Sequence, residues 1–348
     1  MVMERSGIKK IMVRADGNPA IGMGHIMRTM SVMDVLKEWG WQCTYACSLP
    51  APVEFIKKRG FEVIELSFPY REKTREEGRE LLKIMEERGI SKIFVDSYFA
   101  GNDYFSLLNA QAKVILINSA KERFDVSMLI NENIACDKSF FAKLYQGTNT
   151  KLLLGKDYTP LRAEFLGVPY EAGQEVKNIL LMTGGGDQYN FLGQFVLKMR
   201  EKKKYGEISF LCVSGMANSH YKELSAAAQG LPNVRVVHGA DNMAGLMAGC
   251  DLAVSAGGTS VLELAAVGVP TVAFTVAEDQ VEGIGYMDRL GFLVSAGSIA
   301  SHGFWDRLFD QLDALLADPE KRRKMACEAK KQMDARGAAR IAGKIADL

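Results

Sequence analysis

The sequence predicts an α/β protein built from two open domains with mostly parallel sheets. Short aliphatic or β-branched runs alternate with amphipathic stretches along all 348 residues, which is the pattern of βαβ units. The alternation forms two series of similar order, separated by a segment rich in glycine and proline. A chain of this length also corresponds to about two domains of ordinary size.

The first series begins with a strand near residues 10–15 and a helix over residues 25–39. In that helix Ile26 and Met30 recur at helical spacing whereas Arg28 falls on another face, so we expect the helix to pack on one side only. The next segments are expected to be strand, helix, strand, helix, strand and strand, at residues 41–47, 52–59, 61–66, 73–88, 92–98 and 113–118.

The second series alternates in the same way. We expect strands in the segments 178–187, 208–215, 234–239, 252–258, 271–276 and 292–297, with helices at 191–200, 221–228, 243–248 and 260–267 between them. Two further helices are expected at residues 304–317 and 320–334. The final stretch, residues 338–348, is expected to pack back on the first domain.

The domain boundaries follow from where these series stop. We expect a Rossmann-like domain over residues 1–154, a hinge over 155–175, a second Rossmann-like domain over 176–330 and a C-terminal helix over 331–348. The hinge is placed where breakers gather, at Gly155, Pro160, Gly167, Pro169 and Gly173. Open α/β sheets bind ligands at the carboxyl ends of their strands, so the two domains are expected to face each other across a ligand-binding cleft.

Composition excludes several classes of protein. With 43 Lys and Arg against 42 Asp and Glu, the formal charge of +1 leaves no surplus of positive charge for a nucleic-acid backbone. Hydrophobic residues at 48% and charged residues at 24% match a globular chain and not a disordered one. Because the sequence lacks an apolar run of about 18 residues and has charges where a signal peptide is apolar, we expect a cytoplasmic protein without a membrane partner.

The six cysteines are scattered, with no CxxC pair and no histidine at ligand spacing. We therefore expect reduced thiols and no structural zinc site. Cys43 and Cys47 lie four apart in a predicted strand, where period-2 alternation places both on one face, toward the core. The sequence also shows no paired carboxylates of the kind that hold a divalent ion, so neither a metal nor a cofactor is expected.

Three glycine-rich turns, at residues 17–24, 184–187 and 256–260, follow directly after predicted strands. Glycine allows backbone N–H groups to approach a phosphate, and a following helix N-terminus adds partial positive charge, so the turns indicate a phosphorylated ligand. The dinucleotide fingerprint fails at Met27, where its third glycine belongs, and no Gly-Lys-Ser/Thr follows any turn. The alternative is that these glycines only turn the chain.

Two groups of polar residues stand at strand ends of the first domain. His25 follows the first glycine turn near Arg14, Asp16 and Arg28, where a neutral imidazole could accept a proton; the alternative is a capping or buried histidine. The segment Asp96, Ser97 and Tyr98 ends the fourth predicted strand and points to the same crevice, although an aspartate there can also cap the next helix.

In the second domain Glu263 stands three residues after Ser260. This spacing fits a capping box, in which Glu263 reaches back to the N-cap, and it equally fits a carboxylate that accepts hydrogen bonds from ribose hydroxyls. Asp279 and Gln280 open the helix after the strand at 271–276, where an aspartate is an ordinary first-turn residue.

Motifs along nearly the whole chain resemble one family, the pseudaminic-acid pathway UDP-sugar hydrolases (UDP-2,4-diacetamido-2,4,6-trideoxy-β-L-altropyranose hydrolase) and related spore-coat polysaccharide proteins. The matching segments are RAD at 14–16, IGMGHIMR at 21–28, VDSY at 95–98, LIN at 129–131, GKDY at 155–158, LRAEF at 161–165, GGD at 185–187 with Asn190, and SAGGTSVLE at 255–263. The resemblance implies the two-domain GT-B type of fold that the peptidoglycan N-acetylglucosaminyltransferase also uses.

The resemblance also implies roles for single residues. It implies that His25 is the general base, that Tyr98 contacts the substrate, and that Glu263 binds the ribose of UDP. The other substrate- or nucleotide-binding residues that we expect are Arg14, Asp16, Gly22, Gly24, Arg28, Gly185, Gly186, Gly257, Gly258, Thr259, Ser260, Asp279 and Gln280. The pair Asp279-Gln280 departs from the Asn-Gln associated with sugar contact, and the carboxylate removes a donor and adds charge, so we expect a sugar of different stereochemistry or deoxy pattern.

The function expected from these features is hydrolysis of a UDP-linked amino- or deoxy-sugar, with inversion at the anomeric carbon, in pseudaminic-type acid or surface polysaccharide synthesis. The glycan could be that of flagellin, a capsule or a spore coat. One alternative is an inverting glycosyltransferase with the same donor site, because sequence hardly separates a bound water from an acceptor alcohol. The other is a nucleotide-sugar binding protein without turnover.

Overall fold

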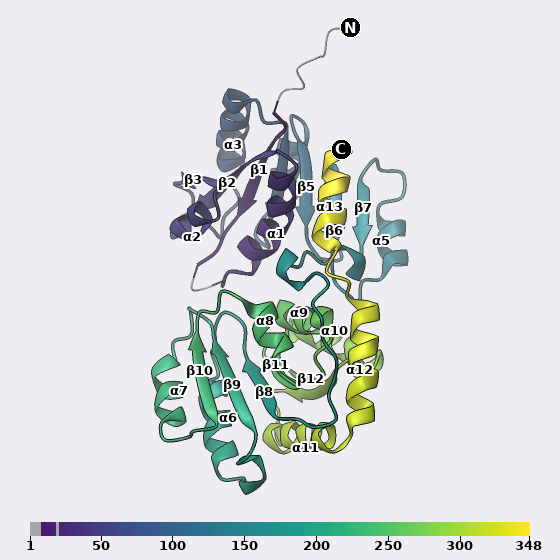
Figure 1. Cartoon of the computed structure of the whole chain (residues 1–348). Coiled ribbons are helices and arrows are strands. Elements are labelled where there is room, and N and C mark those ends of the chain that lie inside the picture. Colours follow the sequence, from purple (N-terminus) through teal and green to yellow (C-terminus); the bar gives the residue numbers. More distant parts are fainter. Residues whose placement is uncertain (1–7, 19–20) are drawn as a thin grey trace. The chain divides into compact units, whose positions relative to one another are not determined.

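The computed structural model describes residues 8–18 and 21–348 and divides the chain into two compact units, each an α/β sandwich around a parallel sheet (Figure 1). Unit 1 comprises Met1–Arg162 together with Arg336–Leu348, and unit 2 comprises Ala163–Ala335. The prediction of two α/β domains with parallel sheets is confirmed. The units are described separately below.

Unit 1 contains a seven-stranded sheet in the order β3-β2-β1-β4-β5-β6-β7, with every pair of neighbours parallel. The strands are β1 (Lys10–Ala15), β2 (Gln42–Ser48), β3 (Glu62–Leu66), β4 (Lys92–Asp96), β5 (Lys113–Ile117), β6 (Met128–Asn131) and β7 (Lys151–Leu154). The helices are α1 (Gly24–Glu38), α2 (Val53–Lys58), α3 (Arg75–Arg88), α4 (Asn102–Asn109), α5 (Lys138–Leu144) and α13 (Gly337–Ala346).

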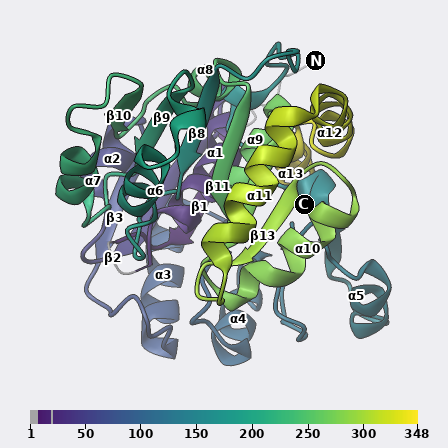
Figure 2. The same ribbon diagram turned by 90° about the horizontal axis from the view of Figure 1, so that it is seen from below.

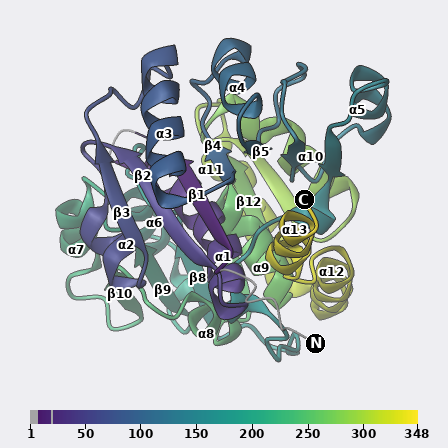
Figure 3. The same ribbon diagram turned by 90° about the horizontal axis from the view of Figure 1, so that it is seen from above.

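Successive side chains of the strands point to opposite faces of this sheet, and each face has its own hydrophobic core. Figure 3 shows α1 and α13 over one face and α3 and α4 over the other. On the first face Ile26 and Met30 of α1 pack with Ile341 of α13, and Cys43 and Cys47 of β2 are buried in the same core. The prediction that both cysteines face the core is therefore confirmed. The helix α1 does not pack on one side only, because the side chain of Arg28, on another face, is 18% exposed and pairs with Asp96 and Glu132.

The helix α13 comes from the far end of the chain and completes the first of these cores. Its first residue, Gly337, lies so close to the backbone of Thr159 that a Cβ there would be 2.0 Å from the Thr159 carbonyl oxygen. Only glycine permits this approach. At the other end of α13, Lys92 Nζ donates to the Ile345 carbonyl at 3.1 Å, which holds the helix against the sheet.

Unit 2 contains a six-stranded parallel sheet in the order β10-β9-β8-β11-β12-β13. Its strands are β8 (Asn178–Met182), β9 (Ser209–Ser214), β10 (Val234–His238), β11 (Leu252–Ala256), β12 (Thr271–Thr275) and β13 (Val294–Ser298). Its helices are α6 (Phe191–Arg200), α7 (Tyr221–Ala228), α8 (Met243–Ala248), α9 (Thr259–Val267), α10 (Val281–Arg289), α11 (Phe304–Ala317) and α12 (Pro319–Gln332).

The core of unit 2 is rich in aromatic rings. Figure 2 shows α6 and α11 over the sheet, and between them Phe191 lies 4.2 Å from Phe274 and 6.4 Å from Phe304, measured between ring centroids. Such packing of large rings contributes both buried area and favourable edge contacts. The rings of α6, β12 and α11 thus form one aromatic cluster in the core of unit 2.

The segment expected to be a hinge is divided between the two units. Residues up to Arg162 belong to unit 1, and the rest is fastened to unit 2 by Arg322, which is 1% exposed and donates hydrogen bonds to four carbonyl groups. These acceptors are Gly173, Gln174, Leu315 and Leu316. Unit 2 begins at Ala163, and Arg322 ties the end of the segment before β8, at Gly173 and Gln174, to the end of α11.

The described residues contain no helix that is both long and apolar enough to cross a membrane. The same residues contain no group of three or more His, Cys, Asp or Glu side chains placed to hold a metal ion.

Candidate functional site

The polar residues of unit 1 gather where the direction of the sheet reverses. The strands β1 and β4 are neighbours, but the chain leaves β1 toward β2 and leaves β4 toward β5. In open α/β sheets this switch point opens a crevice at the carboxyl ends of the two strands. His25, on the first turn of α1 after β1, and Asp96, the last residue of β4, meet there.

His25 and Asp96 form a buried pair. The imidazole Nδ1 lies 2.5 Å from Asp96 Oδ1, and the two residues are 8% and 1% exposed. Burial alone raises the pKa of the Asp96 carboxyl, but the charge of Arg28 and its hydrogen bonds, with the hydrogen bond from His25, outweigh it and hold the pKa below its ordinary value. An ionised carboxylate only accepts hydrogen bonds, so Nδ1 carries the proton and Nε2 keeps its lone pair.

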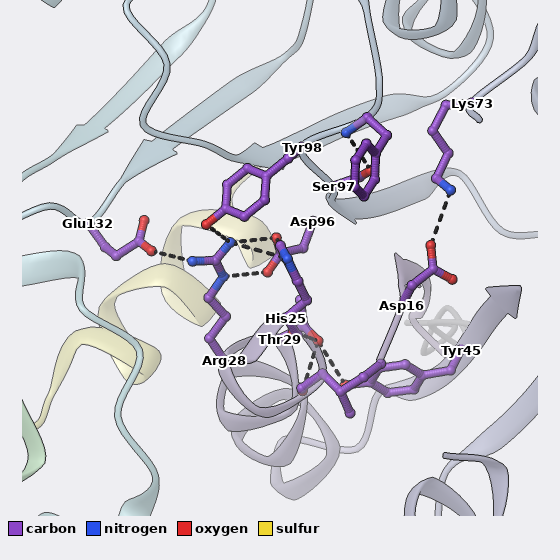
Figure 4. Close-up of polar contacts among 12 residues, drawn as sticks. Asp16, His25, Arg28, Thr29, Tyr45, Lys73, Asp96, Ser97, Tyr98 and Glu132 are labelled. Atoms are coloured by element: carbon purple, nitrogen blue, oxygen red, sulfur yellow. Dashed lines mark hydrogen bonds and ion pairs between the residues drawn. The ribbon is translucent and has the colours of Figure 1, made fainter. Parts of the chain in front are cut away.

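Arg28, one turn further along α1, grips the same carboxylate. Its Nε and Nη2 donate to the two oxygens of Asp96 at 2.5 and 2.7 Å, and its Nη1 donates to Glu132 Oε1 at 2.9 Å (Figure 4). Two carboxylates therefore occupy the guanidinium. We expected Arg28 to bind the substrate. In the structure its guanidinium instead donates to Asp96, the carboxylate that holds His25, and to Glu132.

Tyr98 lies over the histidine at the surface. Its ring meets that of His25 edge to face with centroids 4.7 Å apart, and its hydroxyl lies 3.5 Å from Arg28 Nη2. Tyr98 is 58% exposed, so its ring is accessible to a ligand. In contrast to Arg28, it has the position of a contact residue.

Arg14 and Asp16 belong to a buried network and not to the surface of the site. Arg14 is 0% exposed and donates to Asp16 at 2.6 Å, to Glu77 at 2.7 Å and to Ser48 at 2.6 Å. Asp16 also accepts from Lys73 Nζ at 3.1 Å. The expectation that Arg14 contacts the substrate is thus wrong in this structure, because the side chain is enclosed and its donors are used. Asp16, at 4% exposed, lies in the same network.

Acid should destabilise unit 1 through these carboxylates. Burial raises the pKa of Asp16, but Arg14 foremost and Lys73 overcome it, and the net pKa is lowered, like that of Asp96. A lowered pKa contributes stability above the unfolded value of about 3.9, and that contribution is lost as the pH falls through the folded value. We expect the urea midpoint of unit 1 to fall steeply below about pH 4.

The variant Asp16→Asn checks this expectation. Between about pH 4 and about pH 2 its urea midpoint should fall less steeply with pH than that of the parent protein. Fluorescence in a Trp305→Phe background reports on unit 1 alone, because the three tryptophans are Trp39, Trp41 and Trp305. An unchanged slope in Asp16→Asn would show that this carboxyl is not the source of the acid sensitivity.

The first glycine turn, expected at 17–24, includes residues 19–20, which lie outside the described residues. Of the two glycines singled out there, Gly22 has φ +73° and donates to the Asn18 carbonyl at 2.8 Å. Gly24 is exposed at the start of α1, and a Cβ would find open space at either glycine. The positive φ of Gly22 gives a reason for glycine at that position.

In unit 2 the direction of the sheet reverses between β8 and β11, and the other two glycine turns follow these strands. Gly185 and Gly186 are exposed after β8; Gly257 is half-buried and Gly258 exposed after β11. Gly184, next to the first pair, would place a Cβ 3.8 Å from Ser260 Oγ, so the two turns are close neighbours. Both lie at the place where the topology predicts a ligand.

The two turns differ in the helix that follows. The carboxylate of Asp187 accepts from the N–H groups of Phe191 and Leu192 at 2.7 and 3.0 Å, so a negative charge already occupies the N-terminus of α6. The N-cap of α9 is Gly258, which gives no side-chain cap, and the first turn of α9 has no acidic residue. An anionic phosphate is therefore favoured at α9 and disfavoured at α6.

The start of α9 also decides one open alternative. The helix begins at Thr259, and Gly258 holds φ +124°, a conformation that L side chains rarely adopt. Ser260 is then the second residue of the helix, so the capping box with Ser260 as N-cap and Glu263 as its partner is wrong. Glu263 is half-buried one turn into the helix, and Thr259 is exposed at its tip.

Gln280 and Asp279 lie beside this turn on the short 3-10 helix Glu278–Gln280. Gln280 Oε1 accepts from the Val276 N–H at 2.9 Å, and a Cβ on Gly257 would come within 2.8 Å of that oxygen. The bond fixes the amide against the turn and leaves its NH₂ group as the donor for a ligand. Asp279 is exposed.

Sequence reasoning left several members of these sites without a role. Asp96 was noted only as a strand-end residue with a capping alternative, and it does not cap α4, whose N-cap is Gly101. Glu132 directly follows β6, a position that could have been read from the topology. Asp187 stands four residues before the first residue of α6, and an aspartate just before an apolar helical run is itself a signal for a helix start that could have separated the two glycine turns.

Comparisons with known proteins give one family model and several relatives. Residues 179–341 match the family model described as the glycosyltransferase family 28 C-terminal domain. The spore coat polysaccharide biosynthesis protein SpsG of Bacillus subtilis is 22% identical over 272 residues, covering 76% of this chain and 77% of that protein. The UDP-2,4-diacetamido-2,4,6-trideoxy-β-L-altropyranose hydrolase of Campylobacter jejuni is 24% identical over 240 residues, covering 68% and 81%.

Among solved structures, MurG of Acinetobacter baumannii has a TM-score of 0.66 at 16% identity, and the match covers 98% of this chain and 100% of that one. At such identity the likeness concerns the fold. With the topology of the two sheets, it shows that the chain has the GT-B type of fold that the motifs implied. The similarity to spore coat proteins and to the UDP-sugar hydrolase, first inferred from the motifs, is found again in the sequence matches.

Proposed function

We propose that this protein is an enzyme that hydrolyses a UDP-linked amino- or deoxy-sugar to the free sugar and UDP, with inversion at the anomeric carbon. The observation that carries the proposal is the buried pair of His25 and Asp96 at the switch point of unit 1. The open N-terminus of α9 in unit 2 and the matches to a UDP-sugar hydrolase and a polysaccharide protein support it.

Unit 2 supplies the nucleotide site in this proposal. The diphosphate binds Gly257, Gly258, Thr259 and Ser260, where N–H groups of α9 and its partial positive charge stabilise the leaving UDP. Glu263 accepts hydrogen bonds from the ribose, and Gly185 and Gly186 line the same turn region. Because UDP is a good leaving group at neutral pH, no strong general acid is required.

Unit 1 supplies the base. Water attacks the anomeric carbon on the face opposite to UDP, the bond from that carbon to the diphosphate oxygen breaks, and its electron pair leaves with UDP. His25 Nε2 takes the proton from the water, because Asp96 holds the other ring nitrogen. Tyr98 contacts the sugar beside His25, and the NH₂ group of Gln280 in unit 2 donates a hydrogen bond to the substrate.

The direct test is to incubate the purified protein with UDP-amino-sugars and no acceptor, and to follow the anomeric signals by NMR. Release of UDP with an inverted free sugar supports hydrolysis. If UDP appears only when an acceptor alcohol is added, the protein is a glycosyltransferase, a candidate that the match to glycosyltransferase family 28 favours. Binding of UDP with every UDP-sugar left intact would contradict both.

Glu263→Ala should weaken UDP binding about 10- to 100-fold, the effect of losing a hydrogen bond to a charged group. The value of kcat at saturating UDP-sugar should change little, because the ribose is far from the reacting bond. Titration calorimetry with UDP measures the loss, and Glu282→Ala, an exposed glutamate on α10, is the matched control. Equal affinity in both variants would argue against the ribose contact.

The wider role proposed is a cytoplasmic step in the synthesis of a pseudaminic-type acid or a surface polysaccharide, such as the glycan of flagellin or a spore coat. The relatives named for spore coat polysaccharide and for hydrolysis of a diacetamido sugar support this context. The side chain of Asp279, exposed beside Gln280, gives a means by which the sugar could differ from those of the relatives.

A further inference from the structure

We propose that Arg28, anchored by Glu132, is a positioning residue that holds Asp96 and offsets its charge, so that the imidazole of His25 stays in its proton-accepting form. For its part in turnover the inference rests on the proposed function. Its geometry and its main test concern unit 1 alone.

The contacts account for this role. Both oxygens of Asp96 accept from Arg28, and the third bond of the guanidinium goes to Glu132, which follows β6. A planar guanidinium with two carboxylates has a fixed orientation. Asp96 therefore cannot rotate away from His25, and the ring is held with Nδ1 toward β4, as Figure 4 shows.

The charges around His25 explain why the positive charge of Arg28 matters for a neutral imidazole. An aspartate beside a histidine favours the imidazolium form, which has no lone pair to accept a proton from water. Arg28 Nη2 lies 3.3 Å from Nδ1 and so opposes that protonation. The described groups around the ring are Asp96 and Tyr98 from the end of β4 and Arg28 from α1, while Glu132 faces the ring only through Arg28.

The test compares histidine titrations by NMR in the full-length protein and in Arg28→Gln, Arg28→Lys and Asp96→Asn. The chain has four histidines, so the signals of His25 can be identified as those lost in His25→Ala. In Arg28→Gln the His25 signals should move at a pH about one unit higher or more, and in Asp96→Asn at a lower pH. Arg28→Lys keeps the charge and should stay within about half a unit of the parent.

Kinetics give a second readout. In Arg28→Gln we expect kcat at neutral pH to fall about 10- to 100-fold with KM for the UDP-sugar within about threefold, and activity to recover as the pH rises. Arg28→Lys loses the second bond to Asp96, so kcat should fall several-fold while the shape of the pH profile is kept. A residue that only supported the fold would not produce this difference between the two variants.

Several results would overturn the inference. One is a KM raised tenfold or more in Arg28→Gln with unchanged kcat and unchanged His25 titration, which would make Arg28 a substrate ligand. Another is an identical shift in Arg28→Gln and Arg28→Lys. If Arg28→Gln fails to fold, judged by tryptophan fluorescence of unit 1 in the Trp305→Phe background, Arg28→Lys and Asp96→Asn still decide, because the first should leave the pH of the His25 titration nearly unchanged and the second should lower it.

The failure of this inference and that of the proposed function are distinguishable. If His25→Ala retains full turnover while the titrations shift as expected, the electrostatic role of Arg28 stands and the assignment of the base fails. If His25→Ala is inactive and the titrations do not shift, the base stands and the role of Arg28 fails.

Discussion

Replacing His25 by alanine is expected to lower the rate of UDP release from a UDP-sugar by about 10²–10⁴-fold, the usual contribution of a general base. Water then has no acceptor for its proton, although the diphosphate site in unit 2 is untouched. The affinity for UDP should change little, since α9 and Glu263 remain in place. Single-turnover assays of UDP release, together with calorimetry of UDP binding, measure the two quantities separately.

His302→Ala is the matched control, because His302 is an exposed histidine in unit 2, outside both switch points. Its turnover should equal that of the parent. His25 is largely buried, so the unfolding of unit 1 must be measured in His25→Ala as well. A folded His25→Ala protein with parental turnover would remove the histidine from the mechanism.

Replacing Arg14 by methionine is expected to lower the free energy of unfolding of unit 1 by about 3–5 kcal/mol, the cost of breaking a buried ion pair by removing one partner. The change leaves the carboxylates of Asp16 and Glu77 enclosed, with only Lys73 to offset two negative charges. Methionine fills much of the space, so the loss reports chiefly on charge. Urea unfolding in the Trp305→Phe background measures it.

Arg79→Ala removes an arginine from the same unit, but its pair with Glu76 on α3 is exposed at 61% and 69% of the two side chains. The expected change is within about 0.5 kcal/mol. If Arg14→Met and Arg79→Ala cost the same, the buried network does not stabilise unit 1. If Arg14→Met retains stability but loses activity, Arg14 acts on the site after all.

Much of the fold could be predicted because apolar runs and breakers alternate clearly in the sequence. The helices α6, α7, α8 and α11 begin and end at the predicted residues. In contrast, α4, α5 and β7 were not predicted. They are eight, seven and four residues long. Length alone does not explain the miss, because α7 and α8, of eight and six residues, were predicted; packing on the sheet stabilises these short elements.

The sites could be predicted in part. The turns and His25 were placed at strand ends, but the sequence does not say which strands are neighbours, and His25 and Asp96 are 71 residues apart. Their contact follows from the pairing of β1 with β4. Arg14 lies two residues after Met12 in β1, so the two side chains point to the same face of the sheet. That face is buried under α3 and α4, which is why Arg14 contacts Glu77 and not a ligand.

The position of α13 has a consequence for how the protein is made. This helix covers α1, the helix that carries His25, yet all of unit 2 is translated before it. On the ribosome, the second unit can therefore acquire its core while the first still exposes the apolar side of α1. The catalytic half of the proposed enzyme becomes complete only once the last helix has left the exit tunnel, so premature termination should yield a chain that chaperones retain.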